Sequence, residues 1–245
     1  MRHLKFLSAY FFIMTMFCCN VTKLDSKNSI YILNQVKEKY DVSGNWKNSE
    51  IKIHIQEPRV GNPKRYTRLV FNNTSGYFEM QRTKDIGAIK RIININGESK
   101  IFVDGKSVLS NEIKEKYALN KQKTEEHKNF YKILYGVPMS LTNELWNTIE
   151  PAQSGEYQGK EVYRIDLVLK ENVISKNWTL IISKEMDKLL AIEFNHPEDG
   201  ADGGEILRFF GEYEFNGVKI PRIRNWYSQS QNEYLGSDVI IEKLK

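Results

Sequence analysis

The sequence predicts an α+β domain, in which one strongly curved, unclosed antiparallel sheet (a half-barrel) holds helices in its concave face. Most of the chain consists of short segments in which apolar and polar residues alternate, with turn residues between them, as is typical of antiparallel hairpins. Only residues 29–40 and 111–136 have apolar residues at helical spacing. A sheet that is apolar on one face must cover that face, and these two segments are the available cover.

The first nineteen residues predict an export signal that ends in two cysteines. A basic region, Arg2 to Lys5, precedes an uncharged apolar stretch from Phe6 to Phe17. This stretch is about 12 residues long, which is within the range of signal peptides and below the ~20 that a membrane-spanning helix needs. Cys19 is the expected lipidation site, because a small residue, Cys18, then precedes the cleavage point. An ordinarily cleaved signal and a retained anchor are the alternatives.

We therefore divide the chain into a lipoprotein signal peptide over residues 1–19, a tether over 20–28 and a single domain over 29–245. No cysteine follows Cys19, so the mature domain cannot contain a disulfide, but a domain of this length can bury enough core to fold without one. The chain has 36 Lys and Arg against 31 Asp and Glu, and removal of the two basic residues of the signal leaves a net charge of +3. This nearly balanced charge argues against nucleic acid as a partner.

The N-terminal half contains one amphipathic helix, followed by a run of strands. Apolar residues recur at helical spacing from Ile30 to Tyr40, and Gly44 follows as a stop signal. From residue 51 to 103 the period changes to two, as in IKIHIQ, whose isoleucines fall on one face. The turn-rich segments NPKR, NNTSG, TKDIG and INGE separate these strands.

Residues 111–136 predict a second helical region, because they contain no Gly or Pro until their last residue and follow Ser110, a suitable N-cap. Polar residues at interior positions, Asn120 and Thr124, indicate two helical pieces instead of one long helix. The lysine-rich part, residues 116–132, is interpreted as a solvated helix face, with contact to anionic lipid as the alternative.

The C-terminal half returns to strands with their apolar residues on one face, as in EVYRIDLVL and LLAIEF. Ile181 interrupts the alternation of NWTLII. If the half-barrel encloses a cavity, this face lines it, and an apolar cavity binds acyl chains through buried area. The residues expected to supply most of that lining are Trp178, Leu180, Phe194, Phe209, Tyr213 and Phe215. The alternative is that the same side chains form a solid core between the sheet and the helices.

Three segments carry a family resemblance: YKILYGVPMSL (Tyr131–Leu141), GKEVYRIDL (Gly159–Leu167), and FNGVKIPRIRNWY (Phe215–Tyr227) followed by LGSDVIIEKL. Together they resemble the outer-membrane lipoprotein carrier (LolA-like) fold, and more specifically its uncharacterised envelope lipoproteins from Gram-negative bacteria. The resemblance extends from about residue 29 to the end of the chain. It implies an unclosed barrel with helices across its mouth, and a protein that carries or binds lipids or lipoprotein acyl chains.

The sequence departs from the dedicated carrier in two ways. That carrier has an arginine inside its barrel that governs cargo release, whereas Arg222 and Arg224 here are arginines near an apolar strand and neither is matched to it. The carrier is also soluble, whereas this chain is expected to be lipidated, as a receptor or resident binder would be. We expect a location in the bacterial cell envelope, with the lipid anchor in the outer membrane and the domain facing the periplasm.

Signatures of catalysis and cofactor binding do not occur: G-x-S-x-G, H-E-x-x-H, the P-loop and G-x-G-x-x-G are all absent. The acidic loop from His196 to Glu205 lacks the spacing of a calcium loop and is interpreted as a glycine-rich hairpin, with a metal site as the alternative. We therefore expect no metal, no cofactor and no enzymatic activity. The predicted function is a membrane-tethered envelope lipoprotein that binds a lipid or acylated ligand. The alternative is a plugged half-barrel that acts as a protein-binding or scaffold module for another envelope protein.

Overall fold

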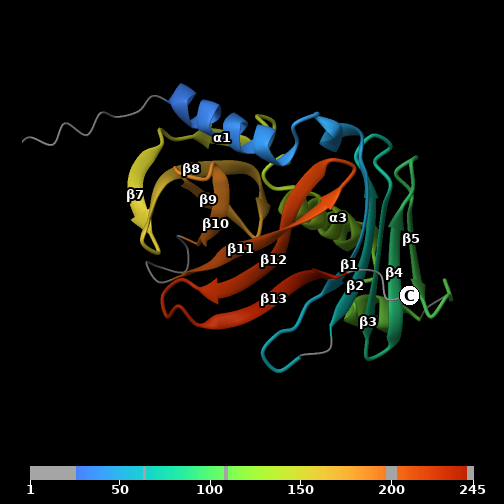
Figure 1. The fold of residues 1–245 in the computed structure, drawn as a ribbon. Coiled ribbons are helices and arrows are strands. Elements are labelled where there is room, and N and C mark those ends of the chain that lie inside the picture. Colours follow the sequence, from blue (N-terminus) through green and yellow to red (C-terminus); the bar gives the residue numbers. More distant parts are fainter. Residues whose placement is uncertain (1–25, 63–64, 108–109, 197–202, 242–245) are drawn as a thin grey trace, which may run out of the picture.

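A computed structural model of the protein describes residues 26–62, 65–107, 110–196 and 203–241 (Figure 1). Its helical elements are α1 (Ser26–Tyr40), the 3₁₀ helix η1 (Asn45–Asn48), α2 (Asn111–Lys116) and α3 (Lys121–Gly136). The strands before α2 are β1 (Glu50–Gln56), β2 (Tyr66–Asn72), β3 (Phe78–Lys84), β4 (Gly87–Ile93) and β5 (Ser99–Val103). The strands after α3 are β6 (Trp146–Ile149), β7 (Gln153–Tyr157), β8 (Lys160–Val173), β9 (Ser175–Ser183), β10 (Lys188–Asn195), β11 (Gly204–Phe215), β12 (Val218–Ser228) and β13 (Tyr234–Ile241).

All thirteen strands of the described residues belong to one antiparallel sheet. Its order is β5-β4-β3-β2-β1-β13-β12-β11-β10-β9-β8-β6, and β7 pairs with the first part of β8. The pairing of β1 with β13, in which His54 lies opposite Ile241, joins the two halves of the sheet. The path runs from β5 to β6 and does not close on itself. The predicted α+β class, with one large unclosed antiparallel sheet, is confirmed.

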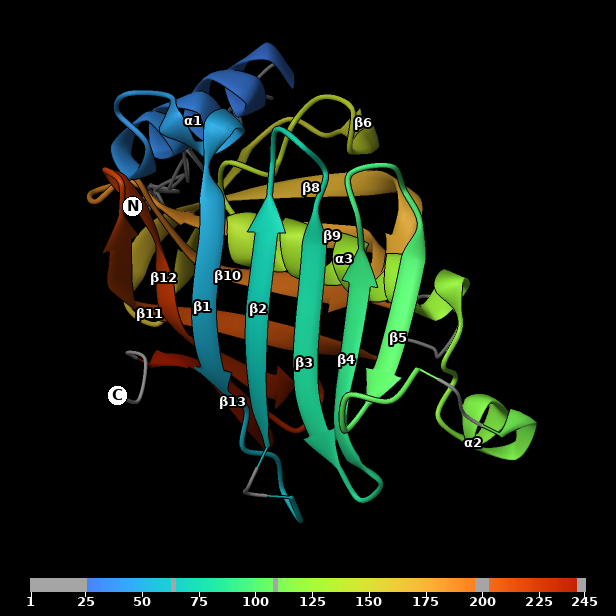
Figure 2. The ribbon, with the colours of Figure 1, turned by 90° about the vertical axis from the view of Figure 1, so that its right-hand side faces the viewer.

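Helix α3 lies between the two halves of the sheet, with β1 to β5 on one side and β8 to β12 on the other (Figure 2). It contacts β4, β5 and β12. Helix α1 lies across one end of the molecule and contacts β10 and β12 (Figure 1). The sheet thus receives its helical cover mainly from α3, and α1 covers the strand ends.

The predicted division of residues 111–136 into two helices is confirmed, and side-chain capping explains it. Ser110 Oγ accepts a hydrogen bond from the third backbone N–H of α2 (3.3 Å). Asn120 Oδ1 accepts one from the third backbone N–H of α3 (2.8 Å). Ala118, between the two helices, has a φ of 47°, which ends α2. Asn120 therefore starts a new helix instead of sitting inside a longer one.

One main core cluster contains residues of α1, of α3 and of both halves of the sheet. Members that are at most 2% exposed include Leu33, Val36, Leu134, Ile53 and Phe194. A smaller cluster lies on the opposite face of the C-terminal strands and consists of Val162, Ile181, Ala191 and Ile206. Ile181 interrupts the alternation of its strand because that strand buries both of its faces.

Helix α1 begins at Ser26, three residues before the predicted helix start. The predicted signal peptide with its acceptor Cys19, and most of the predicted tether, lie outside the described residues, so both stay predictions. Among the helices of the described ranges, none is both long enough and apolar enough to cross a membrane.

Candidate functional site

Three of the predicted lining residues lie together in a filled part of the main core. Trp178, Leu180 and Phe194 are at most 1% exposed. The rings of Trp178 and Phe194 meet edge to face with centroids 5.0 Å apart, and Phe194 stacks on Trp226 at 5.6 Å. The Trp178 indole N–H donates to the backbone oxygen of Ser175 (2.8 Å). In this structure, protein side chains therefore occupy the space beside these rings.

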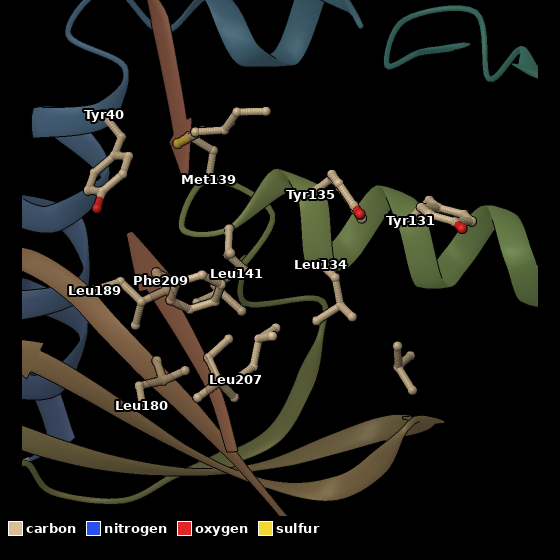
Figure 3. Close-up of a cluster of buried hydrophobic side chains, with 14 of the residues drawn as sticks. Tyr40, Tyr131, Leu134, Tyr135, Met139, Leu141, Leu180, Leu189, Leu207 and Phe209 are labelled. Atoms are coloured by element: carbon tan, nitrogen blue, oxygen red, sulfur yellow. The ribbon is translucent and has the colours of Figure 1, made fainter. Parts of the chain in front are cut away.

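The other three predicted residues follow one another along β11. Phe209 is 8% exposed and belongs to the same buried cluster as Leu141 and Leu189 (Figure 3). Tyr213 and Phe215 are half-buried, and their rings lie 6.3 Å apart at the margin of the core. The structure thus brings four of the six residues into the buried core and leaves the last two at its edge.

A largely apolar opening lies between the end of α1, η1 and the end of α3, and we call it the helix cleft. Its volume is about 540 Å³, which is within the ~300–1,000 Å³ range of small-molecule sites. Trp46, Ile133 and Met139 form its apolar wall. Trp46 and Met139 belong to the main core, and Ile133 packs against it. The floor of the cleft is therefore the surface of the same core that contains Trp178 and Phe194.

Polar contacts after α1 fix the position of Trp46. The Asp41 carboxylate accepts hydrogen bonds from the backbone N–H groups of Asn45 (2.8 Å) and Trp46 (2.9 Å). The Asn73 side chain donates to the backbone oxygen of Trp46 (2.7 Å), and the indole meets the Phe71 ring edge-on at 6.0 Å. The sequence pattern indicates only a helix stop in this segment. The buried aromatic beside the stop signal was the cue to a site there.

Three lysines, Lys37, Lys47 and Lys132, surround the helix cleft. Burial lowers the pKa of Lys37, although Glu144 opposes the shift. Burial also lowers the pKa of Lys132, together with the charge of Lys128. Because these ammonium groups are partly desolvated, an anionic group at the rim would stabilise their charged form. The cleft thus combines an apolar wall with a rim of three lysines and two carboxylates, Glu38 and Asp41.

Gly136 allows Trp46 to pack against the end of α3. A Cβ atom at Gly136 would lie 2.4 Å from Cζ2 of Trp46 and 2.9 Å from the Cβ of Ser140. We expect Gly136→Ala to lower the free energy of unfolding by about 1–3 kcal/mol, because the buried indole has to shift. Denaturant unfolding measures this change. Gly155→Ala is the matched control, with its nearest atom at 3.6 Å and an expected change within ~0.5 kcal/mol. Equal stability of the two variants would contradict this packing.

Arg224 is fully buried and contacts α3. Its Nη1 donates to the backbone oxygen of Pro221 (2.6 Å) and its Nε to that of Leu134 (3.4 Å). The guanidinium lies 4.1 Å from the centroid of the Tyr135 ring. Burial lowers the pKa of Arg224. Within the described part of the chain, Arg224 Nη2 and the Tyr135 hydroxyl have no hydrogen-bond partner. The sequence pattern does not predict this burial, because an arginine is rarely buried, although Arg224 lies on the same face of β12 as the buried Ile220.

A buried ionic network connects the end of β1 to β3 and α3. Glu57 is 1% exposed. Its carboxylate accepts hydrogen bonds from Arg82 (2.9 Å), Arg65 (3.1 Å), Thr67 (2.6 Å) and Tyr131 (3.0 Å). Burial alone would raise the pKa of Glu57, but the charges of Arg82 and Arg65 outweigh it and hold that pKa below its usual value. The carboxylate is therefore ionised and fully partnered.

The acidic loop with the alternative metal assignment is only partly described. His196 Nε2 lies 2.9 Å from Glu205 Oε2, at the two ends of the loop, and residues 197–202 lie outside the described ranges. Among the residues that the structure describes, no group of three or more His, Cys, Asp or Glu side chains is placed to hold a metal ion.

Comparisons with known proteins agree with this architecture. A family model described as a family of unknown function (DUF6503) matches residues 8–243. No curated protein matches the sequence. A domain described as an outer membrane lipoprotein-sorting protein from Vibrio parahaemolyticus is 10% identical, with a TM-score of 0.51 over 90% of this chain and 95% of that one. A LolA superfamily protein from Nitrosomonas europaea is 9% identical, with a TM-score of 0.52 over 89% and 92%. The predicted LolA-like fold is confirmed.

Proposed function

The chain belongs to the family of unknown function DUF6503, and we propose that it is a non-catalytic, membrane-tethered lipoprotein of the cell envelope that binds a lipid or acylated ligand. On this proposal, Cys19 carries the acyl anchor in the outer membrane, and the domain is a curved half-barrel that faces the periplasm. The observation that carries the proposal is the helix cleft, whose apolar wall is open to solvent and continuous with the main core.

An acyl chain fits the chemistry of this cleft. Its methylene groups would cover Trp46, Ile133 and Met139, and burial of apolar surface stabilises such a complex by about 25 cal/mol per Å². A carboxylate, phosphate or ester at the head of the chain would lie among the rim lysines. The deeper lining around Trp178 would take part only if the end of α3 moved away from the sheet, because side chains fill that space here.

A titration with a fluorescent fatty acid tests the proposal on residues 20–245, exported without the anchor. We expect Ile133→Asp to weaken binding by about 10- to 100-fold, because a charge replaces one apolar wall of the cleft. Ile95→Asp is the matched control, since Ile95 is 68% exposed on the β4–β5 hairpin. Unchanged affinity in Ile133→Asp would place binding elsewhere. A wild-type protein that does not bind the probe would contradict the proposed function.

The filled core favours a second candidate function, the plugged scaffold. Trp178, Leu180 and Phe194 are in contact with protein and fully buried, as expected of a solid core that binds no chain. On this alternative the partner is another envelope protein, and the fatty acid titration shows no saturable binding.

A further inference from the structure

A second cavity lies beside the N-terminal part of α3, and we call it the arginine cavity. Its volume is about 400 Å³. Its walls come from α3, from the end of the β1–β2 connection, from β3 and from the β8–β9 turn. The lining divides into two chemically different groups. The cationic residues are Arg65, Arg82 and Lys123, and the apolar residues are Phe130, Val173 and Ile174.

The cationic group retains unused hydrogen-bond donors. Arg82 is 9% exposed; its Nε donates to Thr67 Oγ1 (2.8 Å), and its Nη2 donates to Glu57. Arg65 donates to the same carboxylate through its Nε. One buried carboxylate therefore serves two guanidinium groups. Among contacts of the described residues, Nη1 of Arg82 and both Nη atoms of Arg65 remain for a ligand.

His127 is an uncharged member of the lining. It lines the arginine cavity, and burial together with Arg91 and Arg82 lowers its pKa to about 3. It is thus neutral at physiological pH and adds no charge to the cavity. Of the two acidic residues in the lining, Glu126 bonds to Lys123 Nζ (2.8 Å) and Glu171 is exposed. Because Arg65 and Arg82 share the single negative charge of Glu57, and Glu126 pairs with Lys123, the two guanidinium groups keep one uncompensated positive charge for an anion.

One apolar residue of the lining, Ile174, lies in a strained turn. Ile174 has a φ of 72°, in the left-handed region that β-branched residues rarely adopt. Its neighbours fix it there: Val173 belongs to the main core, and Ser175 Oγ donates to the backbone oxygen of Asn195. Strain of this kind persists only where the surroundings impose it, and it is often found at ligand sites. The turn places Ile174 in the same lining as Arg65 and Arg82.

We propose that the arginine cavity binds a small ligand that carries a phosphate or carboxylate next to an apolar group. The anion would bind Arg65, Arg82 and Lys123, and guanidinium groups are well suited to it because they form paired, charge-assisted hydrogen bonds. The apolar part would cover Phe130 and Ile174. This proposal does not depend on the helix cleft, which is lined by different residues.

Isothermal titration calorimetry on the full chain in a neutral detergent tests this site with phenyl phosphate, inorganic phosphate and benzyl alcohol. We expect phenyl phosphate to bind at least about tenfold more tightly than either of the other two, because only it satisfies both walls. The double variant Arg65→Gln/Lys123→Gln should lose about tenfold or more in affinity. Lys100→Gln is the control and should bind as the wild type does, because Lys100 is exposed on β5 and lines neither the arginine cavity nor the helix cleft.

The proposal would be overturned if phenyl phosphate and benzyl alcohol bound with equal affinity. It would also be overturned if the double variant bound phenyl phosphate as tightly as the wild type does. If the double variant unfolds, Lys123→Gln alone tests the same anion contact. This single variant should fold, because the ion-pair partner of Lys123, Glu126, is exposed. A short-chain phosphatidic acid distinguishes the sources of the anion. Tighter binding than phenyl phosphate supports a lipid headgroup, and weaker binding supports a free organic phosphate. Loss of fatty acid binding in Ile133→Asp with phenyl phosphate binding intact would show that the two sites are separate.

Discussion

Glu57→Ala is expected to lower the free energy of unfolding by about 3–5 kcal/mol, because it leaves buried Arg82 without its carboxylate partner. Glu57 is 1% exposed, and Arg82 Nη2 lies 2.9 Å from its Oε2. Tyr131 and Thr67 also lose their acceptor. Denaturant unfolding of the variant measures the loss. The expected change is a large fraction of the total stability of a domain.

Glu50→Ala is the matched control for this change. Glu50 forms an ion pair with Lys52 at 2.7 Å, but both side chains are largely exposed (43% and 65%). Exposed ion pairs typically contribute less than ~1 kcal/mol. If Glu57→Ala lowered the free energy of unfolding no more than Glu50→Ala does, the buried network would not hold β1, β3 and α3 together as described.

The same carboxylate predicts a dependence of stability on pH. Arg82 and Arg65 hold the pKa of Glu57 in the folded protein below its ordinary value of 4.5. Its contribution is therefore fully present above that value and is lost as the pH falls through the folded pKa. Between about pH 5 and pH 3, wild-type stability should fall more steeply than that of Glu57→Gln. Parallel pH profiles of the two proteins would contradict the assignment.

Trp178→Ala is expected to lower the free energy of unfolding by about 3–5 kcal/mol, because the indole fills a close-packed part of the core. Trp178 is 1% exposed and contacts the Phe194 ring. Substitution of a residue that merely lined an empty lumen would lower the free energy of unfolding much less, since its removal would open no new cavity. Thermal or denaturant unfolding therefore separates a filled core from a ligand chamber. Tyr213→Ala, a half-buried member of the predicted lining, should cost clearly less.

Much of the fold was predictable because period-two and helical patterns directly report which side chains face the core. The strands around Ile53 and the division at Asn120 both followed from that pattern and are present in the structure. Ile181 could not be interpreted in this way, because its strand is buried on both faces, and only the arrangement of neighbouring strands shows this.

The candidate sites were less predictable. Trp178 and Phe194 were correctly placed on one face, but alternation cannot show whether a ligand or a helix covers that face. The helix cleft combines Trp46 with Met139, two residues far apart in the sequence. Glu57 lies on the same inward side as the buried isoleucines of β1. The alternation therefore placed it inward, but a carboxylate is not expected to be buried. Sites built from separate elements depend on tertiary contacts that no local pattern contains.

Native mass spectrometry with lipid extraction most directly tests the central claim that this protein binds a lipid or acylated ligand. The sample is residues 20–245, exported without the anchor, before and after extraction and with an added fatty acid. We expect adducts of lipid mass that disappear on extraction, return with the fatty acid and are reduced in Ile133→Asp. A single bare mass that no fatty acid changes would contradict the claim and favour the plugged scaffold.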